Sequence, residues 1–244
     1  MSGHSKWSTI KRQKGITDAK RGQVFTKMAM AITLATKLGG SGDLNSNPRL
    51  RFALNQAKGV NMPKDNIERA IERGLGKGKE ALEEVTYEGF GPPAGGGKIA
   101  YLVEGVTDNK LRTLQEIKNL FERSGGSLAG QGSTAYMFDK IGEIKVTSKG
   151  GDKDSEMLEL IDLGVEDVED DIQGYLVYVE SPQLNTMSIK LTHLGYGVES
   201  CEIVYKPNTT VLITDPDMAK KVVEFAQKLA DHPDIQGVYD NLGD

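Results

Sequence analysis

Histidine and cysteine are few in this sequence and lie far apart. Its three histidines, His4, His193 and His232, do not have metal-ligand spacing to one another or to the single cysteine, Cys201. A zinc site requires several such ligands grouped together. We therefore expect no metal site and no enzyme, and we interpret His193 and His232 as cap and surface residues.

The glycine-rich stretches 39–42 and 95–97 do not have the arrangement of a phosphate-binding loop. The first follows a predicted helix and the second precedes a predicted strand, whereas a phosphate loop follows a strand and opens a helix. The stretch TDNKLR, residues 107–112, does open a helix after a strand, and its free N–H groups beside Lys110 and Arg112 would suit an anion. A helix cap with solvated charges explains the same residues, and we favour it. We expect no cofactor and no small-molecule substrate.

The run VEDVEDD, residues 165–171, places five carboxylates in seven positions. A calcium site would need a ligand loop fixed by glycine, which this run lacks. We interpret the run as a solvated acidic edge of a sheet, since charged edges resist unwanted strand pairing.

Positive charge is concentrated at the start of the chain. Residues 1–80 contain 16 Lys and Arg against 6 Asp and Glu, whereas the remaining 164 residues contain 14 against 29, within an overall formal charge of -5. Cationic side chains displace counterions condensed on phosphates, so a basic segment joined to an acidic body is typical of nucleic-acid binding. A solvated basic surface without a ligand explains the same charges.

The basic residues that we expect to contact phosphates lie in an N-terminal arm and in the helices after it. They are Lys6, Lys11, Arg12, Lys14, Lys20, Arg21, Lys27, Arg49, Arg51, Lys58 and Lys64. Trp7 lies within this arm and has two interpretations: it stacks on a base, or it pins the arm to the helices by burying its ring. We favour the pin, because an unpinned arm would lose affinity to the entropy of ordering.

The elements that position these residues begin with three amphipathic helices. Apolar residues recur at helical spacing from Thr17 or Asp18 to Leu38, and Gly39-Gly40 supplies a stop. Asn47-Pro48 starts a second helix that ends near Gly59, and Pro63 starts a third that stops at Gly74. Short connections indicate a three-helix bundle.

After residue 80 the pattern changes to strands alternating with helices. TYEGFG, KIAYLVEGV and STAYMF are predicted strands, with a helix from about residue 108 to Gly125 before the third. Residues 142–206 follow the order βαββαβ, which is the order of a ferredoxin-like sandwich. TTVLIT, a helix from Pro216 and a last strand DIQGVYDN are expected to complete a second such sandwich.

These elements predict an α+β fold, with an N-terminal three-helix bundle followed by two ferredoxin-like α/β domains, one inserted in the other. We place the basic arm and bundle at residues 1–80, a discontinuous α/β domain at 81–140 plus 207–244, and the inserted domain at 141–206. A single cysteine and the lack of any long apolar segment predict a cytoplasmic protein, or an organellar one with any transit segment absent, that does not contact a membrane.

The sequence also resembles a known family from end to end. The segments GHSKW, DAKRGQVFTK, NMPKDNIERAI, YEGFGP, TDN and GGSL occur in the order found in the YebC/PmpR family, and the likeness runs from Gly3 to VYDNL near the C-terminus. This resemblance implies the architecture described above and a non-enzymatic regulator of gene expression. By the same resemblance, His4 joins Lys6, Lys11, Arg12, Lys20 and Arg21 as residues for nucleic-acid contact.

Three functions remain open at the level of sequence. Members of the family are described as DNA-binding transcriptional regulators, which is our first hypothesis, and also as ribosome-associated factors that bind RNA and relieve stalled translation. The third is a protein-interaction scaffold that uses the acidic domains. The segment KDNIERAIERG offers Asn66, Arg69 and Arg73 to base edges but also carries Glu68 and Glu72, which disfavour sequence-specific readout.

Overall fold

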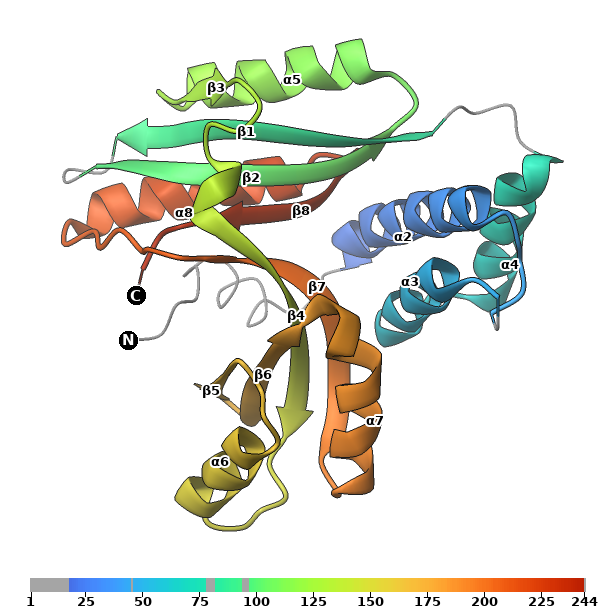
Figure 1. The fold of residues 1–244 in the computed structure, drawn as a ribbon. Helices are drawn as coiled ribbons and strands as arrows, with labels where there is room; N and C mark the ends of the chain where they lie inside the picture. The colour runs from blue at the N-terminus through green and yellow to red at the C-terminus, as the bar shows by residue number, and fades with distance from the viewer. Residues whose placement is uncertain (1–17, 45, 78–81, 94–96, 244) are drawn as a thin grey trace. The chain divides into compact units, whose positions relative to one another are not determined.

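A computed structural model describes residues 18–44, 46–77, 82–93 and 97–243, and the chain divides into two compact units. Residues 1–139 with 206–244 form the first unit, and residues 140–205 form the second, which is inserted into the first. The fold is α+β, with N-terminal helices followed by two four-stranded antiparallel sheets that carry helices (Figure 1). The predicted fold class is confirmed.

The N-terminal helices are α2 (Asp18–Gly39), α3 (Pro48–Gly59) and α4 (Lys64–Glu72), the last continuing into an irregular turn at Arg73–Lys77. They enclose a core that includes Ile32, Leu50 and Ala57, which are fully buried. The three predicted helices are therefore confirmed, with a start one residue later for the third, because Pro63 is its N-cap.

Asn47 fixes the connection between the first two helices. Its side-chain oxygen accepts a hydrogen bond from the Leu50 N–H at 3.0 Å, and its amide donates to the carbonyl oxygens of Ala35 and Ser41. The predicted Asn-Pro start of α3 is thus confirmed. At the other end of α3, Asn61 adopts a left-handed conformation with φ 55°, which asparagine tolerates better than most residues.

The bundle packs against the sheet of the same unit along α2. Met30 and Leu34 contact Leu82 and Val106, the latter at the end of strand β2 (Lys98–Thr107). The Lys27 ammonium donates to the carbonyl oxygen of Ala230, at the end of helix α8 (Pro216–Ala230). One side of α2 is therefore committed to packing within the protein.

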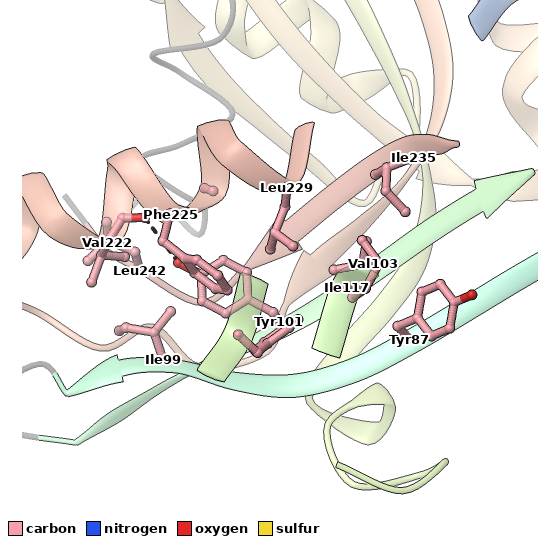
Figure 2. Close-up of a cluster of buried hydrophobic side chains, with 12 residues drawn as sticks. Tyr87, Ile99, Tyr101, Val103, Ile117, Val222, Phe225, Leu229, Ile235 and Leu242 are labelled. Atoms are coloured by element: carbon pink, nitrogen blue, oxygen red, sulfur yellow. Dashed lines mark hydrogen bonds between the residues drawn. The ribbon is translucent and has the colours of Figure 1, made fainter. Parts of the chain in front are cut away.

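The first sheet has the strand order β3-β1-β2-β8. Its remaining strands are β1 (Glu83–Pro93), β3 (Ser127–Ala129) and β8 (Ile235–Asp240), and helix α5 (Lys110–Arg123) packs beside α8. The core between sheet and helices holds Tyr101, Phe121 and Phe225 in edge-to-face contact, with ring centroids 4.9 to 6.1 Å apart. Figure 2 shows Tyr101 and Phe225 side by side among the aliphatic side chains.

Two predicted strands of this unit are wrong. The segment STAYMF is not a strand: Ala135–Met137 is a short 3-10 helix, and the strand that follows α5 is β3. The segment TTVLIT makes only an isolated bridge between Val211 and Leu242. The sheet is complete without it, because β2 pairs with β1 on one side and with β8 on the other.

The misassigned segment is held by a buried carboxylate instead of by strand pairing. Glu88, on β1, is 5% exposed and accepts hydrogen bonds from the backbone N–H groups of Gly132, Thr134 and Ala135 at 2.6 to 2.7 Å. The Thr134 hydroxyl also donates to the carbonyl oxygen of Tyr101 at 2.9 Å. In a strand these backbone N–H groups would donate to a neighbouring strand. Here the Glu88 side chain accepts their hydrogen bonds instead.

The inserted unit has the predicted βαββαβ order. It contains β4 (Phe138–Thr147), α6 (Lys153–Asp162), β5 (Asp167–Asp171), β6 (Gly174–Glu180), α7 (Leu184–His193) and β7 (Gly197–Pro207). The strand order β5-β6-β4-β7 is that of a ferredoxin-like sheet. Where the chain leaves and re-enters the first unit, the Asn208 N–H donates to the Met137 carbonyl oxygen at 2.9 Å.

The acidic run of residues 165–171 includes the edge strand β5, as predicted, but it is not fully solvated. Glu169 is buried, and Asp171 forms an ion pair with Lys145 at 2.9 Å. Lys145 also contacts Glu199 at 3.1 Å, and Lys153 pairs with Asp170 at 2.8 Å. Lysines of the same unit therefore neutralise part of the acidic edge.

Candidate nucleic-acid interface

The predicted contact residues fall into two groups with respect to the structure. His4, Lys6, Trp7, Lys11, Arg12 and Lys14 lie outside the described residues, so both interpretations of Trp7 stay predictions. Lys20 belongs to helix α2, but its side chain is not described. The remaining six, Arg21, Lys27, Arg49, Arg51, Lys58 and Lys64, belong to the bundle.

Helices α2 and α3 are almost free of acidic residues. From Ala19 to Lys64 the sequence contains eight Lys and Arg and one acid, Asp43, which lies in the connection between the helices. Arg21 and Lys58 are exposed. This part of the bundle therefore carries a local excess of positive charge, which favours contact with phosphates.

One outward face of α3 combines side chains suited to nucleic acids. Arg51, Asn55 and Lys58 are spaced i, i+4 and i+7, beside the buried stripe of Leu50, Ala53, Leu54 and Ala57. Asn55 and Lys58 are exposed, and Arg51 is partly exposed, with its Nε donating to the Leu44 carbonyl oxygen at 3.1 Å. Asn55 is not among the predicted contact residues because it is uncharged, although its spacing between Arg51 and Lys58 is a usable signal.

Three other predicted residues are engaged within the protein. Arg49 forms an ion pair with Glu84 at 3.3 Å, and Lys64 pairs with Glu68 at 3.5 Å. Lys27 is bound to the carbonyl oxygen of Ala230. The structure therefore brings Arg51 and Lys58 together on one face and directs Arg49, Lys27 and Lys64 toward partners in the chain.

Helix α4 is less suited to reading bases than its composition indicates. The Arg69 guanidinium donates to the side-chain oxygen of Asn66 at 2.5 Å and to the Asp65 carbonyl oxygen at 3.1 Å. A base edge would have to displace these hydrogen bonds and approach Glu68 and Glu72, which are exposed. Helix α3 is therefore a better candidate than α4 for contact with nucleic acid.

The TDN segment is a helix cap, as favoured from the sequence. The side-chain oxygen of Asn109 accepts a hydrogen bond from the Arg112 N–H at 3.1 Å and caps α5. The Arg112 guanidinium contacts both Asp108 and Asp234 at 2.9 Å, and the hydroxyls of Thr107 and Thr113 also donate to Asp234. Two carboxylates neutralise Arg112, and Lys110 forms an ion pair with Glu83. This helix start therefore does not offer a free cation to an anion.

The same cluster contains a group with the composition of a metal site. Ligand atoms of Glu116, His232 and Asp234 lie within 4.8 Å of one another. However, His232 Nδ1 accepts a hydrogen bond from the Asp234 N–H, so in the neutral ring the proton is on Nε2, which contacts Glu116 at 2.9 Å. A metal at Nε2 would need that proton removed while Nδ1 still faces an N–H donor, which disfavours metal binding here.

Burial alone would raise the pKa of the Asp234 carboxyl, but hydrogen bonds from Thr113, Arg112 and Thr107 outweigh burial and lower it. The pKa of Glu88 is likewise lowered, because hydrogen bonds from Thr134, Gly132 and Ala135 outweigh the effect of burial. A carboxyl with a lowered pKa stabilises the fold above its unfolded pKa of about 4 and loses this contribution as the pH falls through its folded pKa.

We therefore predict that the melting temperature falls in acid, below about pH 4. In the double variant Glu88→Gln/Asp234→Asn neither position can be protonated, so its melting temperature should fall less between neutral and acidic pH than that of the parent protein. Circular dichroism melts at graded pH measure both. An equal fall in the two proteins would contradict the assignment of acid sensitivity to these two carboxyls.

Among the described residues, no helix combines the length and apolar character needed to cross a membrane. Two family models together match nearly the whole chain. "TACO1/YebC protein N-terminal domain" matches residues 5–77, and "TACO1/YebC second and third domain" matches residues 82–242. The boundary between the two matches falls between the end of the irregular turn after α4 and the start of β1.

Proteins from several bacteria are similar over their full length. Relatives named "Probable transcriptional regulatory protein" are 43% identical in Chloroflexus aurantiacus and 40% identical in Syntrophomonas wolfei, with 99% of this chain and 95% and 96% of the relatives covered. The crystal structure of a conserved hypothetical protein, Aq1575, from Aquifex aeolicus is 38% identical, with a TM-score of 0.86 over 98% of this chain and 97% of that chain. This chain is therefore a member of the TACO1/YebC family.

Proposed function

We propose that this protein is a non-enzymatic regulator of gene expression that binds nucleic acid, most specifically as a DNA-binding transcriptional regulator. The observation that carries this proposal is the nearly acid-free pair of helices α2 and α3, with Arg51, Asn55 and Lys58 on one outward face. The names of the relatives support the regulatory role. In this proposal the basic residues of the N-terminal arm, from His4 to Lys14, supply further contacts to phosphates.

The N-terminal part of the chain and its two acidic domains have different tasks in this proposal. Residues 1–80 bind phosphates, while the discontinuous domain of residues 81–140 plus 207–244 and the inserted domain of residues 141–206 carry most of the acidic residues. Their negative charge limits indiscriminate binding to nucleic acid, because phosphates are repelled from these surfaces.

A second candidate function is binding to ribosomal RNA in translation. It is favoured by the hydrogen bonding of the polar side chains on α4. Arg69 and Asn66 are hydrogen bonded to each other, so this helix does not offer a ready set of base-reading side chains. Contacts made mainly to the backbone suit a structured RNA as well as a DNA duplex.

We predict that reversing the charge of four basic residues abolishes nucleic-acid binding without unfolding the protein. The variant carries Lys11→Glu, Arg12→Glu, Lys20→Glu and Arg21→Glu, and a second variant carries Arg51→Glu and Lys58→Glu on α3. The plot of log affinity against log salt concentration has a negative slope. Each lost phosphate contact should make this slope less steep, by about 0.9 for duplex DNA and about 0.7 for single strands. Fluorescence anisotropy with a short duplex at graded salt measures affinity and slope.

The matched control is Lys220→Glu/Lys221→Glu, which reverses two exposed charges on α8. If this control weakens binding as much as the α3 variant does, the effect reflects net charge and the proposed interface is wrong. If the melting temperature of a charge-reversed variant falls together with its affinity, the reversed residues are structural. Co-sedimentation with ribosomes that excess duplex DNA does not remove would favour the RNA candidate.

A further inference from the structure

Helix α6 of the inserted unit has apolar residues on two opposite sides. Leu160 faces inward and is fully buried, whereas Leu158 and Ile161 are 62% and 51% exposed. Their spacing of i and i+3 places Leu158 and Ile161 next to each other, on the side away from the sheet. A surface helix normally carries polar residues there, so the packing of this unit does not account for the pair.

The inward side of α6 also contains a charged residue. Glu156 is 5% exposed, and its carboxylate accepts hydrogen bonds from the backbone N–H of Gly151 at 2.8 Å and of Lys149 at 3.3 Å. The helix thus buries Glu156 together with Leu160, and it exposes a leucine and an isoleucine. Burial within this unit therefore does not account for the exposed pair.

Unneutralised acids lie at both ends of the exposed pair. Asp154 and Asp162 are four residues before Leu158 and four residues after it, and both are exposed. In the described part of the chain neither pairs with a cation, because Lys149 and Lys153 are bound to Glu159 and Asp170. The whole unit, residues 140–205, contains 5 Lys, no Arg and 14 Asp and Glu.

The charges around the pair decide what can cover it. Nucleic acid and anionic lipid would be repelled by Asp154 and Asp162. A second copy of the same face would bring these carboxylates against one another in either relative direction of the helices, which is also unfavourable. A cationic surface with its own apolar residues would gain apolar contact with Leu158 and Ile161 and ionic contact with the two aspartates.

We propose that the outward face of α6, with Leu158 and Ile161 between Asp154 and Asp162, is a docking surface for a cationic amphipathic helix of a partner protein. Such a helix places apolar side chains at i, i+3, i+4 and i+7 against Leu158 and Ile161, while flanking lysines or arginines meet the two aspartates. This surface does not depend on the nucleic-acid interface on α3, so one can be lost without the other.

The test uses the full chain and a labelled synthetic peptide of about 18 residues, a helix with one leucine stripe flanked by lysines. Its affinity is measured by fluorescence anisotropy at physiological salt. We expect the double variant Leu158→Ser/Ile161→Ser to weaken binding about tenfold or more, and Asp154→Asn/Asp162→Asn to weaken it and reduce its salt dependence. Because these side chains are exposed, the melting temperature should not change.

Ile189→Ser on α7 is the matched control, since Ile189 is 53% exposed and lies outside this face. The control should bind as the parent does, and a peptide of the same composition with its leucines spread around the helix should bind more weakly. The proposal is overturned if the peptide does not bind, if the scrambled peptide binds equally, or if Ile189→Ser has the same effect. Self-association of the parent chain that Leu158→Ser/Ile161→Ser removes would also overturn it, in favour of a second copy.

Discussion

Replacing Glu88 with alanine should lower the free energy of unfolding by about 3 kcal/mol or more. The substitution removes the acceptor of three backbone N–H groups, those of Gly132, Thr134 and Ala135. Glu88 is buried, so water does not readily replace its carboxylate as the acceptor. Buried donors without an acceptor cost much more than the net value of the hydrogen bonds that they lose. The expected fall in melting temperature is about 10 °C.

Hydrogen exchange gives a residue-level readout of the same change. The amides of Gly132, Thr134 and Ala135 should exchange much faster in the variant, because their protection depends on the Glu88 carboxylate. Glu84→Ala is the matched control on the same strand, since the Glu84 side chain is 61% exposed and its pair with Arg49 should be worth less than about 1 kcal/mol. Equal effects of the two substitutions would refute the structural role of Glu88.

Asp234→Ala is expected to cost about 2 to 4 kcal/mol of stability. The Asp234 carboxylate accepts hydrogen bonds from Thr113 at 2.6 Å, from Arg112 at 2.9 Å and from Thr107 at 3.1 Å, and both threonines are fully buried. Its loss removes their shared acceptor and one of the two partners of Arg112. Because the Arg112 side chain is 45% exposed, water replaces part of what the guanidinium loses.

Asp108→Ala separates the effect of burial from that of the ion pair. Asp108 and Asp234 contact the same guanidinium at the same distance of 2.9 Å, but their side chains are 49% and 7% exposed. Thermal melts of both variants should show a large loss for Asp234→Ala and a small one for Asp108→Ala. Similar losses would mean that the charge on Arg112, and not the buried threonines, determines the stability of the cluster.

Local periodicity predicted most of the fold. The helical spacing of apolar residues gave the bundle, and alternation with turn residues gave the βαββαβ order of the inserted unit. Both STAYMF and TTVLIT are apolar and rich in β-forming residues, which is why both were predicted as strands. The first is held instead by Glu88, which lies 46 and 47 residues before Thr134 and Ala135. The second makes only the bridge between Val211 and Leu242. A sequence-based assignment does not contain such long-range hydrogen bonds.

The candidate interface was predicted only in part for a similar reason. Charge identified Arg51 and Lys58, which share a face of α3, and equally identified Arg49, which pairs with Glu84 on a distant strand. Composition does not distinguish a cation directed to solvent from one engaged by a carboxylate 35 residues away. The i, i+4, i+7 spacing of Arg51, Asn55 and Lys58 would have distinguished these residues from Arg49, which does not share their face.

The hydrogen bond between the Asn208 N–H and the Met137 carbonyl oxygen joins the two points at which the chain leaves and re-enters the first unit. A gene segment encoding the intervening residues can therefore be gained, lost or exchanged without pulling apart any strand of the parent sheet. Recombination at this position would let different members of a lineage carry different inserts on one scaffold, with the parent core assembled from the same strands in each.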